Sequence, residues 1–205
     1  MSRVGKHIIA IPQGVKVEYS NGTIPTTGHN GFLVSVTGPR GTVLVQEIKA
    51  PIYVTVEENH VHVKRHDDLS ASKSLHGLYN RIIQNMIDGV SKGFTKTLIL
   101  NGVGYKANMK GEDLVLALGY SHPCEIKAEK DIKFKVLTPQ EVQALNLGKD
   151  GVGAVIQVTG ASREKVGAVA AKIRDLRKVE PYHMYGIRYS DEHVVRKESK
   201  SGKKK

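Results

Sequence analysis

The 205-residue chain has little of several residue types, and each shortage excludes a class of protein. It contains no tryptophan, 5% aromatic residues and a single cysteine, Cys124. One cysteine excludes an intramolecular disulfide framework, so a reducing cytosol is the simplest compartment. The few aromatic residues argue against an aromatic-rich pocket for a small-molecule substrate.

Long apolar segments are also missing. No continuous apolar run reaches the roughly 20 residues that a membrane-spanning helix needs, so we expect no transmembrane protein. The N-terminal residues, MSRVGKHIIAIPQGV, lack the apolar h-region and the small-residue cleavage site of a signal peptide. These features predict a cytoplasmic protein.

Acidic residues are outnumbered by basic ones. The 31 lysines and arginines and 20 aspartates and glutamates give a formal net charge of +11 and a pI near 9.6. Such an excess repels itself in a compact protein and is easier to understand where a polyanion neutralises it. Nucleic acid and an anionic membrane surface are the two candidate polyanions.

Hydrophobic residues occur in two similar series along the chain. In the first half, short runs alternate apolar and polar residues between positions 15 and 63, and a helical spacing follows from Leu75 to Val90. The second half repeats this order, with alternating runs between 98 and 136, a strand at Val155–Val158 and a helix after Ser162. We predict an α+β fold of two similar domains, each an antiparallel sheet covered by one main amphipathic helix. The expected limits are 1–92, 93–190 and a basic flexible tail at 191–205.

Local signals predict where the elements begin and end. Ser70 or Ser72 can cap the first helix and Gly93 can end it, whereas Pro181 can end the second. The segments 21–31 and 138–153 are expected to be surface loops, to which the sequence assigns no role.

Three short motifs suggest other chemistry, and each has a simpler explanation. Gly102–Ala107 fits the G-x-G-x-x-A pattern of a dinucleotide loop, but such a loop precedes a helix and an alternating strand is expected here. Gly38–Gly41 fits the GXXG loop of a KH domain, but it joins two expected strands, which favours a hairpin turn. His60, His62 and His66 could share a strand face and bind a metal weakly, although a solvated face is favoured. We expect no enzymatic activity, no cofactor and no metal site.

The last predicted helix and the segment after it have features typical of RNA contact. Cations flank the apolar stripe of the helix, including Lys172 and Arg174. An ordinary final helix with a solvated tail is the alternative. Beyond Pro181 we expect an extended segment in which planar side chains lie beside cations, which suits contact with phosphates and bases: Tyr182, His183, Tyr185, Arg188, Tyr189, Arg196 and Lys197.

Several short segments are specific through their order and spacing. They are MSRVGK at the N-terminus, IPxGV at 11–15, VxGPxG at 36–41, HGL at 76–78, NMxxGV at 85–90, GFxK at 93–96, GVGYKA at 102–107, LGYSHP at 118–123, AAxIR at 170–174, EPY at 180–182 and GIRY at 186–189. In this order they resemble the L-six family of bacterial large-subunit ribosomal proteins, from Met1 to about Lys205.

The resemblance implies two related α+β domains and a structural role, without catalysis, in the large ribosomal subunit. It implies large-subunit rRNA as the partner, close to the sarcin–ricin region where translational GTPases dock, and neighbouring large-subunit proteins beside it. With these partners we expect no membrane partner and no small-molecule substrate. Together with the cationic and aromatic residues described above, it predicts an rRNA-binding set in the second domain and tail: Gly102, Gly104, Tyr105, Lys106, Ser121, His122, Lys172, Arg174, Tyr182, Tyr185, Gly186, Arg188, Tyr189, Arg196 and Lys197.

One stretch departs from the usual pattern of that family. His183, Met184 and Tyr185 stand where Lys-Gly-Lys is usual, which removes two phosphate-binding cations. Two other functions stay open at this point. One is a free cytosolic RNA-binding module, and the other is a nucleotide-dependent enzyme that uses the Gly102–Ala107 loop and therefore needs a helix after it.

Overall fold

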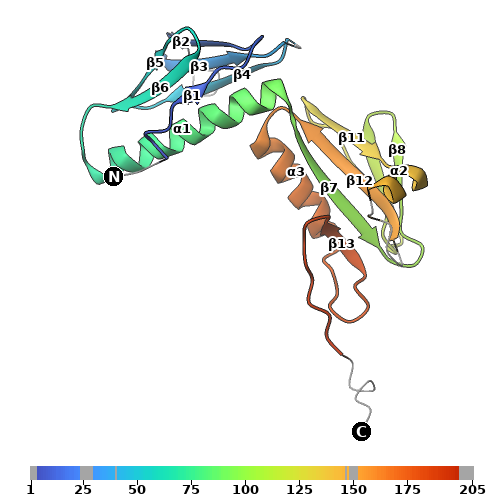
Figure 1. Cartoon of the computed structure of the whole chain (residues 1–205). Coiled ribbons are helices and arrows are strands. Elements are labelled where there is room, and N and C mark those ends of the chain that lie inside the picture. The colour runs from blue at the N-terminus through green and yellow to red at the C-terminus, as the bar shows by residue number, and fades with distance from the viewer. Residues whose placement is uncertain (1–3, 24–29, 40, 146, 148–151, 199–205) are drawn as a thin grey trace. The chain divides into compact units, whose positions relative to one another are not determined.

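The computed structural model describes residues 4–23, 30–39, 41–145, 147 and 152–198 (Figure 1). The chain forms two compact units. Unit 1 comprises Met1–Gly93 with Ala161–Arg163, and unit 2 comprises Phe94–Gly160 with Glu164–Lys205. Every sheet is antiparallel and few helices are present among these residues, which confirms the predicted α+β class. None of the described helices is both long and apolar enough to cross a membrane.

Unit 1 consists of two three-stranded sheets, ordered β1-β6-β5 and β2-β3-β4, and one long helix. The predicted alternation is confirmed in β2, β3, β5 and β6, each of which buries one side in a core shared with α1, whereas the valines of β4, Val43 and Val45, are exposed. Helix α1 contacts β3, β4, β5 and β6, and its helical spacing buries Tyr79, Ile83 and Ile87. The elements are β1 (Ile9–Ala10), β2 (Lys16–Thr23), β3 (Asn30–Thr37), β4 (Val43–Ile48), β5 (Ile52–Val56), β6 (His60–Arg65) and α1 (Ser70–Ser91).

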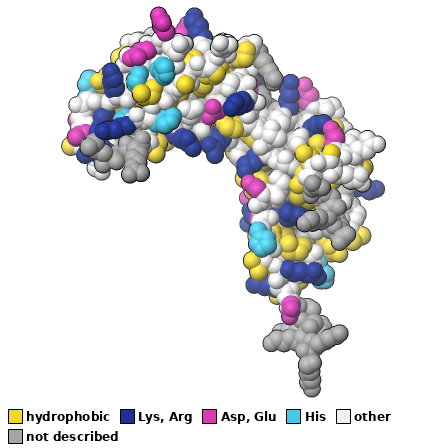
Figure 2. Space-filling model, viewed as in Figure 1, with side chains coloured by type: hydrophobic (Ala, Val, Ile, Leu, Met, Phe, Trp, Pro, Cys, Tyr) yellow, Lys and Arg dark blue, Asp and Glu magenta, His cyan; other side chains and the backbone are white. Residues whose placement is uncertain are grey.

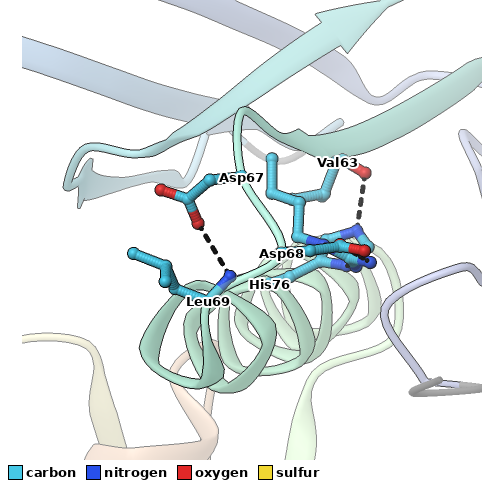
Figure 3. Close-up of polar contacts among 6 residues, drawn as sticks. Val63, Asp67, Asp68, Leu69 and His76 are labelled. Atoms are coloured by element: carbon cyan, nitrogen blue, oxygen red, sulfur yellow. Dashed lines mark hydrogen bonds and ion pairs between the residues drawn. The ribbon is translucent and has the colours of Figure 1, made fainter.

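The start of α1 differs from the prediction. Its N-cap is Leu69, with no side-chain capping bond, and Ser72 is buried, so neither Ser70 nor Ser72 caps the helix. Instead, Asp67 Oδ1 accepts a hydrogen bond from the Leu69 N–H at 3.2 Å (Figure 3). The predicted stop is confirmed, because Gly93 follows the helix with a φ of +79°, a left-handed conformation that glycine adopts without strain.

Unit 2 consists of a four-stranded sheet ordered β11-β12-β7-β13 and a three-stranded sheet ordered β10-β9-β8. The apolar stripe of α3, including Val169 and Ile173, packs into one core with both sheets, whereas α2 lies against the other face of the larger sheet, beside Ile99 and Val155 (Figure 1). The elements are β7 (Phe94–Asn101), β8 (Lys106–Lys110), β9 (Asp113–Ala117), β10 (Cys124–Ile126), β11 (Ile132–Val136), α2 (Pro139–Ala144), β12 (Val152–Gly160), α3 (Arg163–Leu176) and β13 (Gly186–Tyr189).

The structure differs from the predictions at several element boundaries in unit 2 and in the two segments predicted to be surface loops. Helix α3 ends at Leu176, so Pro181 does not terminate it. The segment 182–189 is not wholly an unpaired extended chain, because β13 pairs with β7 and buries Ile187 completely. The segment 138–153 contains α2 and the start of β12. The segment 21–31 contains the last residues of β2 and the first residues of β3. Residues 24–29, 146 and 148–151 lie outside the described part of the chain.

Helix α2 begins with a capping box. Thr138 Oγ1 accepts from the Glu141 N–H at 3.4 Å, and Glu141 Oε2 accepts from the Thr138 N–H at 2.9 Å, while Glu141 Oε1 contacts Lys135 Nζ. The Lys135 ammonium and the Thr138 N–H lower the pKa of Glu141 to about 2. Two orphan N–H groups of the helix start are thereby satisfied.

We expect α2 to become less stable as the pH falls from 4.5 towards 2, because the pKa of Glu141 is lowered from 4.5 to about 2 in the folded chain. A lowered pKa stabilises the fold above the unfolded value and loses this effect as the carboxylate is protonated. Amide exchange of residues 140–144 measures the change. Glu141→Gln is expected to weaken α2 at neutral pH and to remove most of the acid dependence, whereas an unchanged pH profile would contradict the assignment.

Candidate nucleic-acid interface

The glycine turn after β7 is a corner between two strands. Gly104 has a φ of +77° and the Tyr105 N–H donates to the Gly102 carbonyl at 3.3 Å. Strand β8 starts at Lys106, as predicted, so no helix N-terminus is available for a pyrophosphate and the nucleotide-enzyme hypothesis fails. Gly102 and Tyr105 are buried, whereas Val103 at the tip is 87% exposed and Gly104 and Lys106 are exposed.

A second group of side chains lies where residues 119–122 meet the end of α3. Arg177 Cζ lies 5.2 Å from the centre of the Tyr120 ring, and the ring of His122 stacks on Tyr120 with centres 6.3 Å apart. The Tyr120 hydroxyl donates to the Leu176 carbonyl at 2.9 Å. Contacts with Tyr120, and also with Tyr105, raise the pKa of the Arg177 guanidinium. The structure therefore gathers a cation and planar rings at one place, which we call the Tyr120 platform: Tyr105, Tyr120, His122 and Arg177.

A third group surrounds Tyr189 at the end of β13. Arg174 donates from Nε and Nη2 to the two carboxylate oxygens of Glu192, at 3.0 and 2.5 Å, and its Cζ lies 5.6 Å from the Tyr189 ring centre. Lys96 Nζ lies 5.4 Å from the same ring centre, and the Tyr189 N–H donates to Glu192 at 3.2 Å. The bidentate Arg174 contact lowers the pKa of Glu192. Arg174 is thus largely neutralised within the chain, and it holds residues 189–192 against α3.

The remaining predicted residues fall into exposed and internal positions. Ser121, Tyr182 and Tyr185 are exposed, and the ring of Tyr185 stacks on His183 at 5.6 Å. Lys172 is exposed and paired with Glu129 at 3.0 Å. Gly186 is buried, and the half-buried Arg188 reaches the Glu192 carbonyl at 3.5 Å.

The two predicted cations of the tail, Arg196 and Lys197, are exposed, and the N–H of Lys197 donates to the Pro181 carbonyl at 2.9 Å. This bond holds one point of the tail beside the loop that precedes β13. Residues 199–205, which complete the predicted tail, lie outside the described range.

Two cations were missed from the sequence. Arg177 lies within a run of charged residues, Arg174–Lys178, and nothing in that run distinguishes the residue that contacts Tyr120 from its neighbours. Lys96 lies in β7, far from Tyr189 in the chain, and only the pairing of β13 with β7 brings the two together.

The charge of the chain is uneven. Residues 94–205 hold 21 of the 31 lysines and arginines and 13 of the 20 acids, a net charge of +8 against +3 for residues 1–93. The surplus therefore belongs mostly to the half that contains the Tyr120 platform. Among the residues that the structure describes, no group of three or more His, Cys, Asp or Glu side chains is arranged to hold a metal ion.

Comparison with known proteins identifies the family. The model of the family described as ribosomal protein L6 matches twice, over residues 11–93 and 101–190, which fits two similar domains. The chain is 47% identical over 203 residues to the large ribosomal subunit protein uL6 of Clostridium perfringens, with 99% of this chain and 100% of that protein covered. It is 44% identical to the uL6 protein of Clostridium botulinum and 42% identical to that of Geotalea daltonii, each over 204 residues, with both chains fully covered. The chain therefore belongs to the ribosomal protein L6 family.

Proposed function

We propose that the second domain, residues 93–190, binds large-subunit rRNA through the Tyr120 platform and the exposed glycine turn, with the basic tail at 191–205 adding phosphate contacts. The site proposed on the rRNA is close to the sarcin–ricin region, beside neighbouring ribosomal proteins and the translational GTPases that dock there. Membership of the L6 family makes the chain a structural component of the large ribosomal subunit, in the cytoplasm, and not an enzyme.

The observation that carries this proposal is the contact between Arg177 and Tyr120. A guanidinium held on a ring can meet a phosphate while the ring meets a base or ribose, and both are exposed here. The adjacent turn, with Val103 and Gly104 exposed, allows an RNA backbone to approach the protein closely. RNA shape is expected to determine the site more than base readout.

The distribution of internal ion pairs refines the predicted set. Arg174 is engaged by Glu192 and Tyr189, so we assign it to holding β13 and residues 189–192 in place rather than to direct phosphate contact. Lys172 can exchange its exposed partner Glu129 for a phosphate, because an exposed ion pair contributes little to stability. The proposed direct contacts are Gly104, Lys106, Tyr120, Ser121, His122, Lys172, Arg177, Tyr182, Tyr185, Arg188, Arg196 and Lys197.

We expect Arg177→Ala to weaken binding of the full chain to a large-subunit rRNA fragment by roughly tenfold at fixed salt, because one cation and its ring contact are lost. Fluorescence anisotropy with a labelled fragment measures the affinity. Lys16→Ala is the matched control, since Lys16 lies in β2 of unit 1 and pairs with Glu18 at 2.6 Å, and it should change the affinity less than twofold. Equal losses in the two variants would refute the placement of the site in the second domain.

A further inference from the structure

A second surface with RNA-binding chemistry lies on the open face of the β1-β6-β5 sheet in unit 1. Val61 and Val63 of β6 are buried in the core, so His60, His62 and Lys64 project from the opposite face. Cross-strand partners share a face, which adds Tyr53 beside Lys64, Thr55 beside His62 and Ala10 beside His60. We call this surface the histidine face: Ala10, Tyr53, Thr55, His60, His62 and Lys64.

The histidine face borders a cleft. The cleft has a volume of about 760 Å³ and lies between residues 5–8 on one side and residues 62–68 on the other, with Tyr53 in its lining. The cleft is largely open to solvent, which suits a strand lying across the surface better than an enclosed small molecule. The imidazole of His66 packs on the Tyr53 ring with centres 4.7 Å apart, which extends the planar surface at the cleft.

The walls of the cleft are fixed by hydrogen bonds to α1 (Figure 3). Because a carbonyl only accepts, His76 Nε2 donates to the Val63 carbonyl at 2.8 Å, which leaves Nδ1 to accept from Arg65 Nη1 at 2.8 Å. Arg65 also donates from Nε and Nη2 to Asp68 at 2.9 and 2.7 Å. The opposite wall is held by Asn80, whose amide donates to the carbonyls of Gly5 and His7 at 3.2 and 2.8 Å. The cleft is therefore preorganised rather than formed by loose side chains.

Three cations, Lys6, Lys64 and Arg65, and two carboxylates, Asp67 and Asp68, line the cleft. The carboxylate of Asp68 is engaged by Arg65, which lowers its pKa, and Asp67 accepts from the Leu69 N–H. Glu57 lies 3.5 Å from His62 Nε2. Within the described ranges, Lys64 has no acidic partner. His7 and His66 also line the cleft, and Figure 2 shows His side chains among Lys and Arg side chains on the visible face of unit 1.

We propose that the histidine face and its cleft bind a short single-stranded segment of RNA, independently of the site in the second domain. One base stacks at Tyr53 and His66, and the adjoining phosphates lie near Lys64 and the imidazoles. Single strands suit this surface because their bases are free to stack on aromatic rings, whereas bases within a duplex are not. A protein segment with acidic residues would use the cations but not the Tyr53 ring, and the test separates the two.

The test uses the full chain carrying Arg177→Ala, which weakens the site in the second domain. The probe is a labelled single-stranded oligoadenylate or oligouridylate of about eight nucleotides, within the usual site size of such surfaces. Tyr53→Ala is expected to weaken binding roughly tenfold, Tyr53→Phe to preserve it, and Lys64→Gln to weaken it about threefold and reduce the salt slope by about 1. Lys16→Gln, an exposed lysine on the other sheet of unit 1, is the matched control and should have no effect.

Ultraviolet crosslinking provides a readout that does not depend on the variants folding. The crosslinked peptide should contain Tyr53 or His66. Crosslinks confined to residues 94–205, or equal affinity of Lys64→Gln and Lys16→Gln for the probe, would overturn the proposal. So would an oligoglutamate that binds as tightly as the RNA and is unaffected by Tyr53→Ala.

Discussion

Gly186→Ala is expected to destabilise unit 2 by about 3–5 kcal/mol, because the added methyl group meets backbone that cannot move aside. Gly186 has a φ of +139°, and a Cβ built there lies 2.6 Å from the Lys178 carbonyl oxygen and 2.6 Å from the Val179 Cα. The segment after α3 is held at this point by the Ile187 N–H, which donates to the Arg177 carbonyl at 2.8 Å. Relief of the clash would therefore displace β13 from β7.

Urea unfolding followed by circular dichroism, with hydrogen exchange of the β13 and β7 amides, measures this effect. Substitutions at two other glycines separate the steric clash from the backbone strain as causes of the destabilisation. Gly104 also has a positive φ, +77°, but nothing lies within 4 Å of a Cβ built there, so Gly104→Ala should cost only about 1 kcal/mol. Gly167→Ala, within α3 and also without neighbours within 4 Å, should stabilise by about 0.5–1 kcal/mol. A loss at Gly186 no larger than that at Gly104 would contradict the close approach of the two backbone segments.

Binding of the full chain to a large-subunit rRNA fragment is expected to weaken by roughly 10³-fold between about 50 and 200 mM KCl, because five or six phosphate contacts release their counterions. The net charge of +8 in residues 94–205 supplies more than enough cations for that number. Titrations over a series of salt concentrations give the slope of log affinity against log salt, for which we expect roughly −5.

Arg177→Ala should reduce the steepness of that slope by about 1, which assigns one released counterion to this residue. The chain in lysate should sediment with the large subunit and leave it only on washing with high salt. A flat salt response, or the absence of the chain from purified large subunits, would refute a phosphate-dominated interface.

Much of the fold follows from local pattern. The alternation that buries Val34 and Val36, and the helical spacing that buries Ile83 and Ile87, is visible in the sequence because one side of each element must leave water. The glycine corner at 102–104 was predictable for the same reason, since an alternating strand rather than a helix follows it. Helix α2 was missed although its signal is local, since Thr138, Pro139 and Glu141 form a capping box. The helix that this box begins is only six residues long, so no helical spacing of apolar residues marks it.

In the sequence by itself, the order and spacing of the short motifs determined the resemblance to the family, and hydrophobic periodicity determined the two-domain α+β class, since both depend on residues read one after another. Tertiary structure alone decided which side chains meet. It placed Arg177 on the ring of Tyr120, bound Arg174 to the carboxylate of Glu192, and placed Tyr53 beside Lys64 at the edge of a cleft. Periodicity reports which face of an element is buried, whereas a pair of residues distant in the chain is fixed only by strand register and packing.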